Sequence, residues 1–294
     1  MGAVPEVRIS SCDKFMPIIG MGTAVSILSK ENDKETMKAA FIEAIRVGYR
    51  HFDTSSIYQS EQPLDKDLVL PAIKLSLRKL QLEYLDLYLI HVPVKQSQEE
   101  DNQRSNIAKD MISPIDIKGV WEGMEECKNL GLTKAIGVSN FPRSKLEELL
   151  SVAKIPPAVN QVEMNPTWHQ KKLREFCKEK GIHVTAYSPL GAYKDMWGHK
   201  SIMESNVLEE IAKAKGKTKA QIALRWVYEQ GGSAVPKSLN KERMKENLQI
   251  FDWCLTEEEL NKIDRHPQQK AVYFAKTMAA GPSLDFIHEL DAEL

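Results

Sequence analysis

The sequence is poor in cysteine, and its cysteines are widely spaced. Four of them, Cys12, Cys127, Cys177 and Cys254, occur among 294 residues, and they form no CxxC pair. This spacing suggests neither a disulfide framework nor a zinc site. We interpret the four residues as thiols of a protein in the reducing cytoplasm.

Long apolar runs and an excess of one charge are also absent. No stretch approaches the roughly 18 to 20 apolar residues needed to cross a bilayer, and residues 1–10 contain no signal-peptide core. Forty basic and 41 acidic residues give a net charge of −1, so no overall field attracts nucleic acid or an anionic membrane. We therefore expect a cytoplasmic protein whose partner is a small molecule, with no nucleic acid and no membrane partner.

The chain shows no short repeat, low-complexity tract or linker rich in Pro, Gly and Ser, and residues 1–294 are predicted to form a single domain. Short strand patterns alternate with longer helical patterns. The predicted strands are 17–22, 49–53, 85–91, 133–139, 158–163, 183–187 and 233–236. The predicted helices are 34–47, 68–80, 117–130, 144–152, 170–180, 207–215, 218–230, 241–251 and 256–264, the last beginning with a capping box of Thr256 and Glu259.

The predicted strands are largely apolar, which is typical of a parallel sheet covered by helices. An α/β fold of the (β/α)8 type, the TIM barrel, is therefore predicted. The alternative is a doubly wound sheet, whose first strand is typically followed by a GxGxxG turn when it binds a dinucleotide. Residues 20–23 (GMGT) are too short to form that turn.

The number of strands is one too low for this barrel. Seven are recognisable, whereas eight close the barrel. Only 14 residues separate Asp53 from Leu68, too few for a crossover helix followed by another strand. The chain is predicted to lack the third strand and the helix before it, which should leave a breach between the strands ending at Asp53 and His91.

Active sites of such barrels lie at the carboxyl ends of the strands. Polar side chains follow four of the predicted strands: Asp53 with Tyr58, His91, Ser139 with Asn140, and Gln161. A lone residue of these types is usually explained by packing or by hydrogen bonds to loop backbone. Their occurrence together at strand ends makes this face of the barrel the candidate site.

Several segments resemble the signature segments of the aldo-keto reductase family. They are residues 48–54 (GYRHFDT) with Tyr58, 85–91 (LDLYLIH), 131–141 (GLTKAIGVSNF), and 235–238 (VPKS) with Arg243, Glu246 and Asn247. They occur in the family's order over nearly the whole chain. Residues 120–127 (VWEGMEEC) and 165–170 (NPTWHQ) resemble most the plant enzymes of specialised metabolism related to chalcone (polyketide) reductase, codeinone reductase and methylecgonone reductase.

The resemblance implies an oxidoreductase that reduces an aldehyde or ketone with NADPH, reversible as alcohol oxidation. Tyr58 would donate a proton to the carbonyl oxygen, and His91 would orient that oxygen. In the family, a lysine paired with Asp53 raises the acidity of the tyrosine, and this chain lacks that lysine. Lys66 is the nearest substitute, but its family-matched neighbours place it outside the active site, as an ordinary solvated lysine.

The resemblance also implies a binding site for NADP(H). From the nicotinamide to the adenine, the residues assigned to it are Thr23, Asp53, Ser139, Asn140, Gln161, Tyr187, Ser188, Leu190, Lys237, Ser238, Arg243, Glu246 and Asn247. Lys237, Ser238 and Arg243 would bind the 2′-phosphate and so select NADPH over NADH.

Three residues, His91, Val92 and Trp121, are assigned to the substrate pocket. Val92 stands where relatives often have Trp, which implies a roomier pocket. Residues 95–113 and 267–294 are long for connections and are expected to shape this pocket as well.

Other functions remain open beside carbonyl reduction. One is a catalytically impaired or non-enzymatic NADP(H)-binding relative, or a chain that folds poorly because a segment was lost, for example by exon skipping. A barrel lyase or metal hydrolase is disfavoured, because no metal-ligand cluster of suitable spacing occurs. A correctly folded chain is expected to be a monomer that binds no metal.

Overall fold

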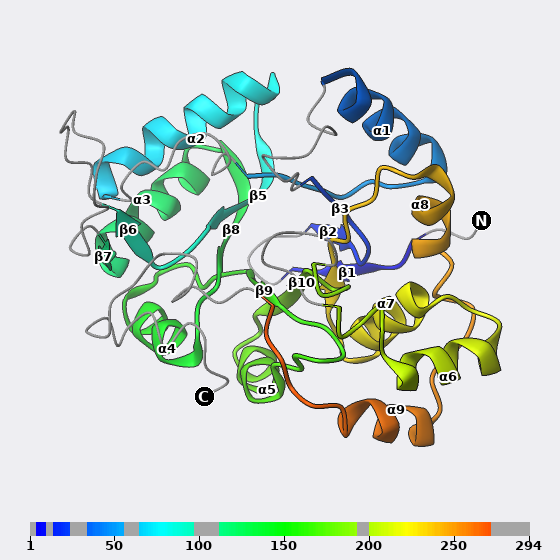
Figure 1. Cartoon of the computed structure of the whole chain (residues 1–294). Coiled ribbons are helices and arrows are strands. Elements are labelled where there is room, and N and C mark those ends of the chain that lie inside the picture. Colours follow the sequence, from blue (N-terminus) through cyan, green and yellow to red (C-terminus); the bar gives the residue numbers. More distant parts are fainter. Residues whose placement is uncertain are drawn as a thin grey trace, which may run out of the picture.

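The computed structural model of the chain describes residues 4–9, 14–23, 34–55, 65–96, 112–192 and 200–271. Helices surround a set of parallel strands (Figure 1). The strands are β1 (Glu6–Arg8), β2 (Phe15–Pro17), β3 (Met21–Gly22), β4 (Phe52–Asp53), β5 (Leu85–Ile90), β6 (Val94–Gln96), β7 (Ile112–Pro114), β8 (Thr133–Ser139), β9 (Val159–Glu163), β10 (His183–Tyr187) and β11 (Ser233–Ala234). The helices are α1 (Lys34–Val47), α2 (Lys66–Leu80), α3 (Ile117–Asn129), α4 (Arg143–Val152), α5 (Lys171–Glu179), α6 (Asn206–Lys215), α7 (Lys219–Glu229), α8 (Lys241–Asn247) and α9 (Glu257–Asp264). None of these described helices has the length and apolar character to cross a membrane.

Short parallel strands form the wall of the barrel. Five of them make one sheet in the order β5, β8, β9, β10 and β11, and β3 pairs in parallel with β4. A parallel bridge between Ile19 and Ala234, with the N–H of Gly20 donating to the Ala234 carbonyl at 2.8 Å, joins β11 to the segment that leads into β3. The order around the wall is therefore β5, β8, β9, β10, β11, β3 and β4, the order of a (β/α)8 barrel without its third strand.

The wall is not closed by backbone pairing between β4 and β5, a place that we call the unpaired junction. Among the described strands, β4 pairs with β3 alone and β5 pairs with β8 alone. Helices α1 and α2 stand on the two sides of this junction (Figure 1). The predicted breach between the strands ending at Asp53 and His91 is confirmed.

Alternation along β8 decides which side chains face the inside of the barrel. Ile136 and Val138 belong to the core cluster shared with the helices, whereas Ala135 packs with residues of the opposite face. A Cβ atom on Gly137 would lie 2.6 Å from the carbonyl oxygen of Val159, so only glycine fits there. Because the side-chain period of a strand is two, Ser139 shares the inner face of the barrel with Ala135 and Gly137.

The amino-terminal hairpin closes one end of the barrel. Strands β1 and β2 pair antiparallel, and Ile9 and Met16 pack against Ala135 and Val159. This cluster lies near the amino ends of β8 and β9, which leaves the carboxyl ends for the candidate site.

A few predicted elements differ from the observed ones. The strand predicted at 17–22 is divided, because Phe15–Pro17 pair with β1 and only Met21–Gly22 pair with β4, and the strand predicted at 49–53 is reduced to β4. The helix predicted at 241–251 ends at Asn247, where the carbonyls of Glu246 and Gln249 accept hydrogen bonds from the Gln221 side chain. The antiparallel pairing of β6 with β7, at the two ends of the loop predicted at 95–113, was not expected.

Candidate active site

The ends of β8 and β9 are tied together by side-chain and backbone hydrogen bonds. The Ser139 hydroxyl donates to the carbonyl of Gln161 at 2.7 Å, and the N–H of Asn140 donates to the same carbonyl at 2.9 Å. Asn140 has a φ of 60°, a left-handed conformation in which asparagine is enriched. This turn sets the Asn140 side chain over the strand ends.

The carboxamide of Asn140 joins three strands of the barrel. Its Nδ2 donates to the carbonyl of His91 at 2.9 Å, and its Oδ1 accepts a hydrogen bond from the Tyr187 hydroxyl at 2.8 Å. His91 follows β5 and Tyr187 ends β10. The structure therefore brings together these residues, as the sequence analysis predicted.

Asp53 is held by an amide. Its Oδ1 accepts a hydrogen bond from Gln161 Nε2 at 3.0 Å, which connects the ends of β4 and β9 across the barrel. Among the described residues, no lysine or arginine forms an ion pair with Asp53; the ion pairs of this part of the chain lie elsewhere. Within the described residues, the side-chain partner that the structure gives Asp53 is therefore an amide.

His91 lies half-buried at the end of β5, with its Nδ1 atom 3.1 Å from the Ser55 hydroxyl. Burial lowers the pKa of His91, and the neighbouring Asp53 carboxylate raises it in part. Because the net shift is downward from an ordinary value near 6.5, the imidazole is neutral at pH 7. A neutral ring can donate one hydrogen bond and accept another.

The predictions for Tyr58 and Lys66 have different outcomes. Tyr58, the predicted proton donor, lies outside the described residues. Lys66 is the first residue of α2, with Nζ 2.6 Å from Glu122 Oε2 and half of its side chain exposed. Its interpretation as a surface lysine outside the site is confirmed, although it begins a helix and does not lie in a loop.

The predicted phosphate-binding residues follow β11 and lie beside the end of β3. The N–H of Gly22 donates to the Pro236 carbonyl at 3.2 Å, and a Cβ atom on Gly22 would lie 2.5 Å from the Val235 carbonyl oxygen. The N–H of Thr23 donates to the carbonyl of Asp53 at 3.1 Å. These contacts place Lys237 next to the carboxyl end of the barrel.

The remaining predicted cofactor residues lie on two segments. Ser238 exchanges hydrogen bonds with the Asn240 backbone, and Arg243 is exposed on α8. Glu246 is half-buried, whereas Asn247 is 3% exposed. After β10, Ser188 has a φ of 46° and Leu190 packs against the core. Their roles toward the cofactor stay predictions.

The substrate residues are only partly placed as expected. Val92 lies beside His91 and is 8% exposed. Trp121 is 1% exposed within the core on α3, and its indole N–H donates to the Ile155 carbonyl at 3.0 Å. A side chain so enclosed by helix packing is a core residue, so the assignment of Trp121 to the substrate pocket is wrong.

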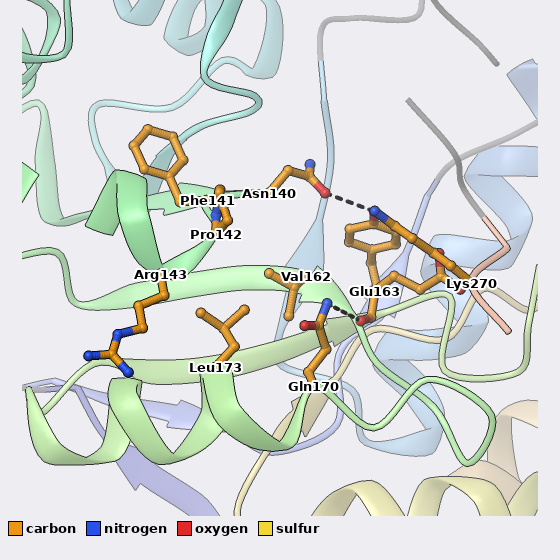
Figure 2. A pocket seen from close by; sticks show the side chains of 10 residues that line it. Asn140, Phe141, Pro142, Arg143, Val162, Glu163, Gln170, Leu173 and Lys270 are labelled. Carbon is orange, nitrogen blue, oxygen red and sulfur yellow. Dashed lines mark hydrogen bonds between the residues drawn. The ribbon is translucent and has the colours of Figure 1, made fainter. Parts of the chain in front are cut away.

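A small hollow beside Asn140 was not predicted. Figure 2 shows the amino end of Lys270 directed toward Asn140, and Gln170 donating to the Glu163 carbonyl. Lys270 and Glu163 are 3% and 1% exposed, and the N–H of Ala271 donates to Glu163 Oε1 at 2.6 Å. The sequence signal that could have predicted this hollow is Glu163, an acidic residue at the end of β9. The hollow is lined by Asn140, Phe141, Pro142, Arg143, Val162, Glu163, Gln170, Leu173, Tyr187 and Lys270.

The side chains at these strand ends fit NADP(H). Amide and hydroxyl groups of Ser139, Asn140 and Gln161 gather beside the Tyr187 ring, which suits an uncharged ring with a carboxamide. Lys237 and Arg243 supply the cations that a phosphate requires. Within the part of the chain that the structure describes, no cluster of His, Cys, Asp and Glu suitable for a metal occurs.

Comparison with known proteins gives consistent matches. The profile described as Aldo/keto reductase family matches residues 64–268. The chain is 54% identical to D-galacturonate reductase of Fragaria ananassa over 100% of both chains. It is 50% identical to NADPH-dependent codeinone reductase 1-4 of Papaver somniferum over 91% of each chain, and to NAD(P)H-dependent 6'-deoxychalcone synthase of Glycine max over 90% of each.

Solved structures match as well. An aldo-keto reductase of Bombyx mori in complex with NADP has a TM-score of 0.83 and 29% identity, over 95% of this chain and 98% of that one. The aldose reductase of Schistosoma japonicum has a TM-score of 0.79 and 27% identity, over 91% and 94%.

The alignment with the strawberry enzyme is longer than this chain. It runs over 327 positions, 33 more than the 294 residues of this chain. Together these positions are about as many as a βαβ unit requires, which is about 30 residues or more.

Proposed function

The chain belongs to the aldo-keto reductase family, and from this premise we propose that it reduces an aldehyde or ketone with Tyr58 as proton donor, slowly because the lysine segment is missing. It is an NADP-dependent oxidoreductase built on a barrel of the (β/α)8 type. The observation that carries the proposal is the hydrogen-bonded network that holds Asp53, His91, Asn140, Gln161 and Tyr187 at one end of the barrel.

Four residues of this network, together with Tyr58, have proposed roles in the reaction. NADPH supplies the hydride when it is bound. Asn140 and Gln161 hold the nicotinamide end in place, and Tyr187 offers its ring as a stacking surface. His91 donates a hydrogen bond that orients the carbonyl oxygen, and Tyr58 transfers its proton to that oxygen.

The missing lysine limits the proton transfer. A neutral tyrosine has a reference pKa of about 10, so it needs a nearby cation to give up its proton readily at pH 7. Asp53 has an amide partner here, and an amide cannot stabilise a phenolate as a cation does. General acid catalysis typically contributes about 10² to 10⁴ in rate, so we propose turnover at least about a hundredfold below that of a complete enzyme.

The test compares this chain with a variant into which the missing βα unit of the strawberry relative has been inserted. NADPH oxidation is followed with D-galacturonate, the substrate in that relative's name, and with small aldehydes. We expect slow turnover by this chain, at least about a hundredfold faster turnover by the insertion variant, and loss of the residual rate in Tyr58→Phe. Equal rates in the two proteins contradict the role given to the lysine.

The alternative function is binding of NADP(H) without turnover. It is supported by the same cofactor residues and by the lack of a cation at Asp53 among the described residues. Fluorescence titration with NADPH, combined with no detectable oxidation in the presence of any aldehyde of the panel, would favour it over slow catalysis.

A further inference from the structure

Ser55 and His91 join the ends of two strands that have no backbone pairing. Ser55 follows β4 and His91 follows β5, on the two sides of the unpaired junction. The Ser55 hydroxyl lies 3.1 Å from His91 Nδ1. The orientation of the imidazole therefore depends on a side-chain contact at a place where the sheet itself provides no hydrogen bonds.

From this geometry we propose that Ser55 is a positioning residue for His91: its hydroxyl donates a hydrogen bond to Nδ1 and holds the neutral ring with its proton on Nε2. The inference rests on the proposed function, in which His91 donates a hydrogen bond to the carbonyl oxygen. Among the residues that the structure describes, none forms a hydrogen bond with Nε2 of His91.

The hydroxyl of serine can either donate or accept, so the direction of this bond has a chemical consequence. If Ser55 donates to Nδ1, the ring carries its proton on Nε2 and can donate to a carbonyl oxygen. If Nδ1 carries the proton and donates to Ser55, Nε2 is a bare lone pair that repels the same oxygen. Only the first arrangement is compatible with orienting a carbonyl.

Two other histidines supply internal references. His51 Nδ1 lies 3.0 Å from the carbonyl oxygen of Pro17, and because a carbonyl only accepts, the Nδ1 of His51 must carry a proton. His183 Nε2 lies 3.0 Å from the Ser233 hydroxyl. His51 thus marks the tautomer that we exclude for His91, and Ser233 offers a serine–histidine pair at the amino ends of β10 and β11, away from the candidate site.

The test is nitrogen-15 NMR of the ring nitrogens in the full chain without cofactor, which reads the tautomer directly. We expect His91 with its proton on Nε2, opposite to His51. In Ser55→Ala, the neutral ring loses the hydrogen-bond donor at Nδ1, so the tautomer with its proton on Nδ1 should become populated. Ser55→Thr should restore the tautomer with its proton on Nε2, and the matched control Ser233→Ala should leave His91 unchanged.

A kinetic readout separates positioning from a structural role. If the chain turns over, Ser55→Ala should lower kcat about five- to tenfold, the equivalent of about one hydrogen bond, and Ser55→Thr should restore it. A proton on Nδ1 in the wild type, or no change of tautomer in Ser55→Ala, overturns the proposal whether or not the chain is active. The expected tautomer change in an inactive chain supports it and counts against the proposed function alone.

Discussion

Among single residues, Lys237 and Arg243 are the two cations that we expect to bind the 2′-phosphate. Arg243 is exposed, and its helix is held to α1 by the ion pair of Lys241 with Glu43 at 2.9 Å. The guanidinium is therefore free to reach a ligand while its helix stays in place. This contact is one that NADH cannot use.

We predict that Arg243→Ala weakens binding of NADPH about ten- to a hundredfold and leaves binding of NADH nearly unchanged, because a charge-assisted hydrogen bond contributes roughly 1.5 to 3 kcal/mol. Fluorescence titration of both cofactors measures this. Lys245→Ala on the same helix, whose ion pair with Glu242 lies within α8, is the matched control and should leave the ratio of the two affinities intact. Equal affinity of the wild type for NADPH and NADH would rule out the assignment.

A second residue-scale prediction concerns His183 inside the barrel. Burial, with a smaller effect of the neighbouring His51, lowers the pKa of His183 from 6.5 to about 4. The unfolded chain therefore binds a proton between about pH 6.5 and 4 that the folded chain does not. The contribution of His183 to the free energy of unfolding is fully present above pH 6.5. It is lost as the pH falls through this range, by up to about 3 kcal/mol.

Thermal unfolding measured between pH 7 and pH 4 checks whether stability falls with falling pH, as predicted. His183→Gln keeps an amide near the Ser233 hydroxyl but does not titrate, so its stability should fall less steeply with pH. Parallel pH dependences of the wild type and the variant would show that the acid sensitivity arises elsewhere.

At the scale of secondary-structure elements, the sequence predicts helix ends best. Thr256 and Glu259 form the predicted capping box of α9, with the Thr256 N–H donating to Glu259 Oε2 at 2.7 Å and the Glu259 N–H to the Thr256 hydroxyl at 3.2 Å. Thr218 and Gln221 do the same for α7. Such caps depend on residues three apart, so tertiary structure has little influence on them.

We predict that Thr256→Ala lowers the free energy of unfolding by about 1 kcal/mol, because an N–H in the first turn of α9 loses its acceptor. Urea denaturation measures the change, and Thr256→Ser should lose only a small part of it. A loss below the error of the measurement would mean that water replaces the cap at no cost.

At the scale of the whole molecule, the unpaired junction is the main departure from a closed barrel. Ile42 and Ile45 of α1 are 41% and 49% exposed, and Leu82 and Tyr84, between α2 and β5, are 52% and 40% exposed. Unpaired strand edges beside exposed apolar side chains favour association between chains. We therefore propose a monomer only for a chain in which other residues cover the unpaired junction.

We predict that the chain self-associates with rising concentration and unfolds over a broad temperature range. Ile42→Lys together with Ile45→Lys should reduce the association, and insertion of the missing βα unit should abolish it and sharpen the transition. Light scattering and calorimetry measure the two effects. A concentration-independent monomer with a sharp transition would show that the junction is harmless.

The sequence alone determined the features that depend on local pattern. Period and capping predicted most helices and strands, such as α1 and β8, and the spacing between Asp53 and Leu68 predicted the missing unit. The family's motifs predicted the set of polar residues that meets at the strand ends. These signals lie within short stretches of chain, so they survive without knowledge of the fold.

Tertiary structure alone decided the partners of these residues. Gln161 holds Asp53 over a separation of 108 residues, Ser55 meets His91 over 36, and Trp121 turns from an expected ligand contact into core. Burial and hydrogen bonding between distant segments arise only when the strands are placed side by side. A sequence motif states which side chains are available, and the packing of the barrel decides which atoms they face.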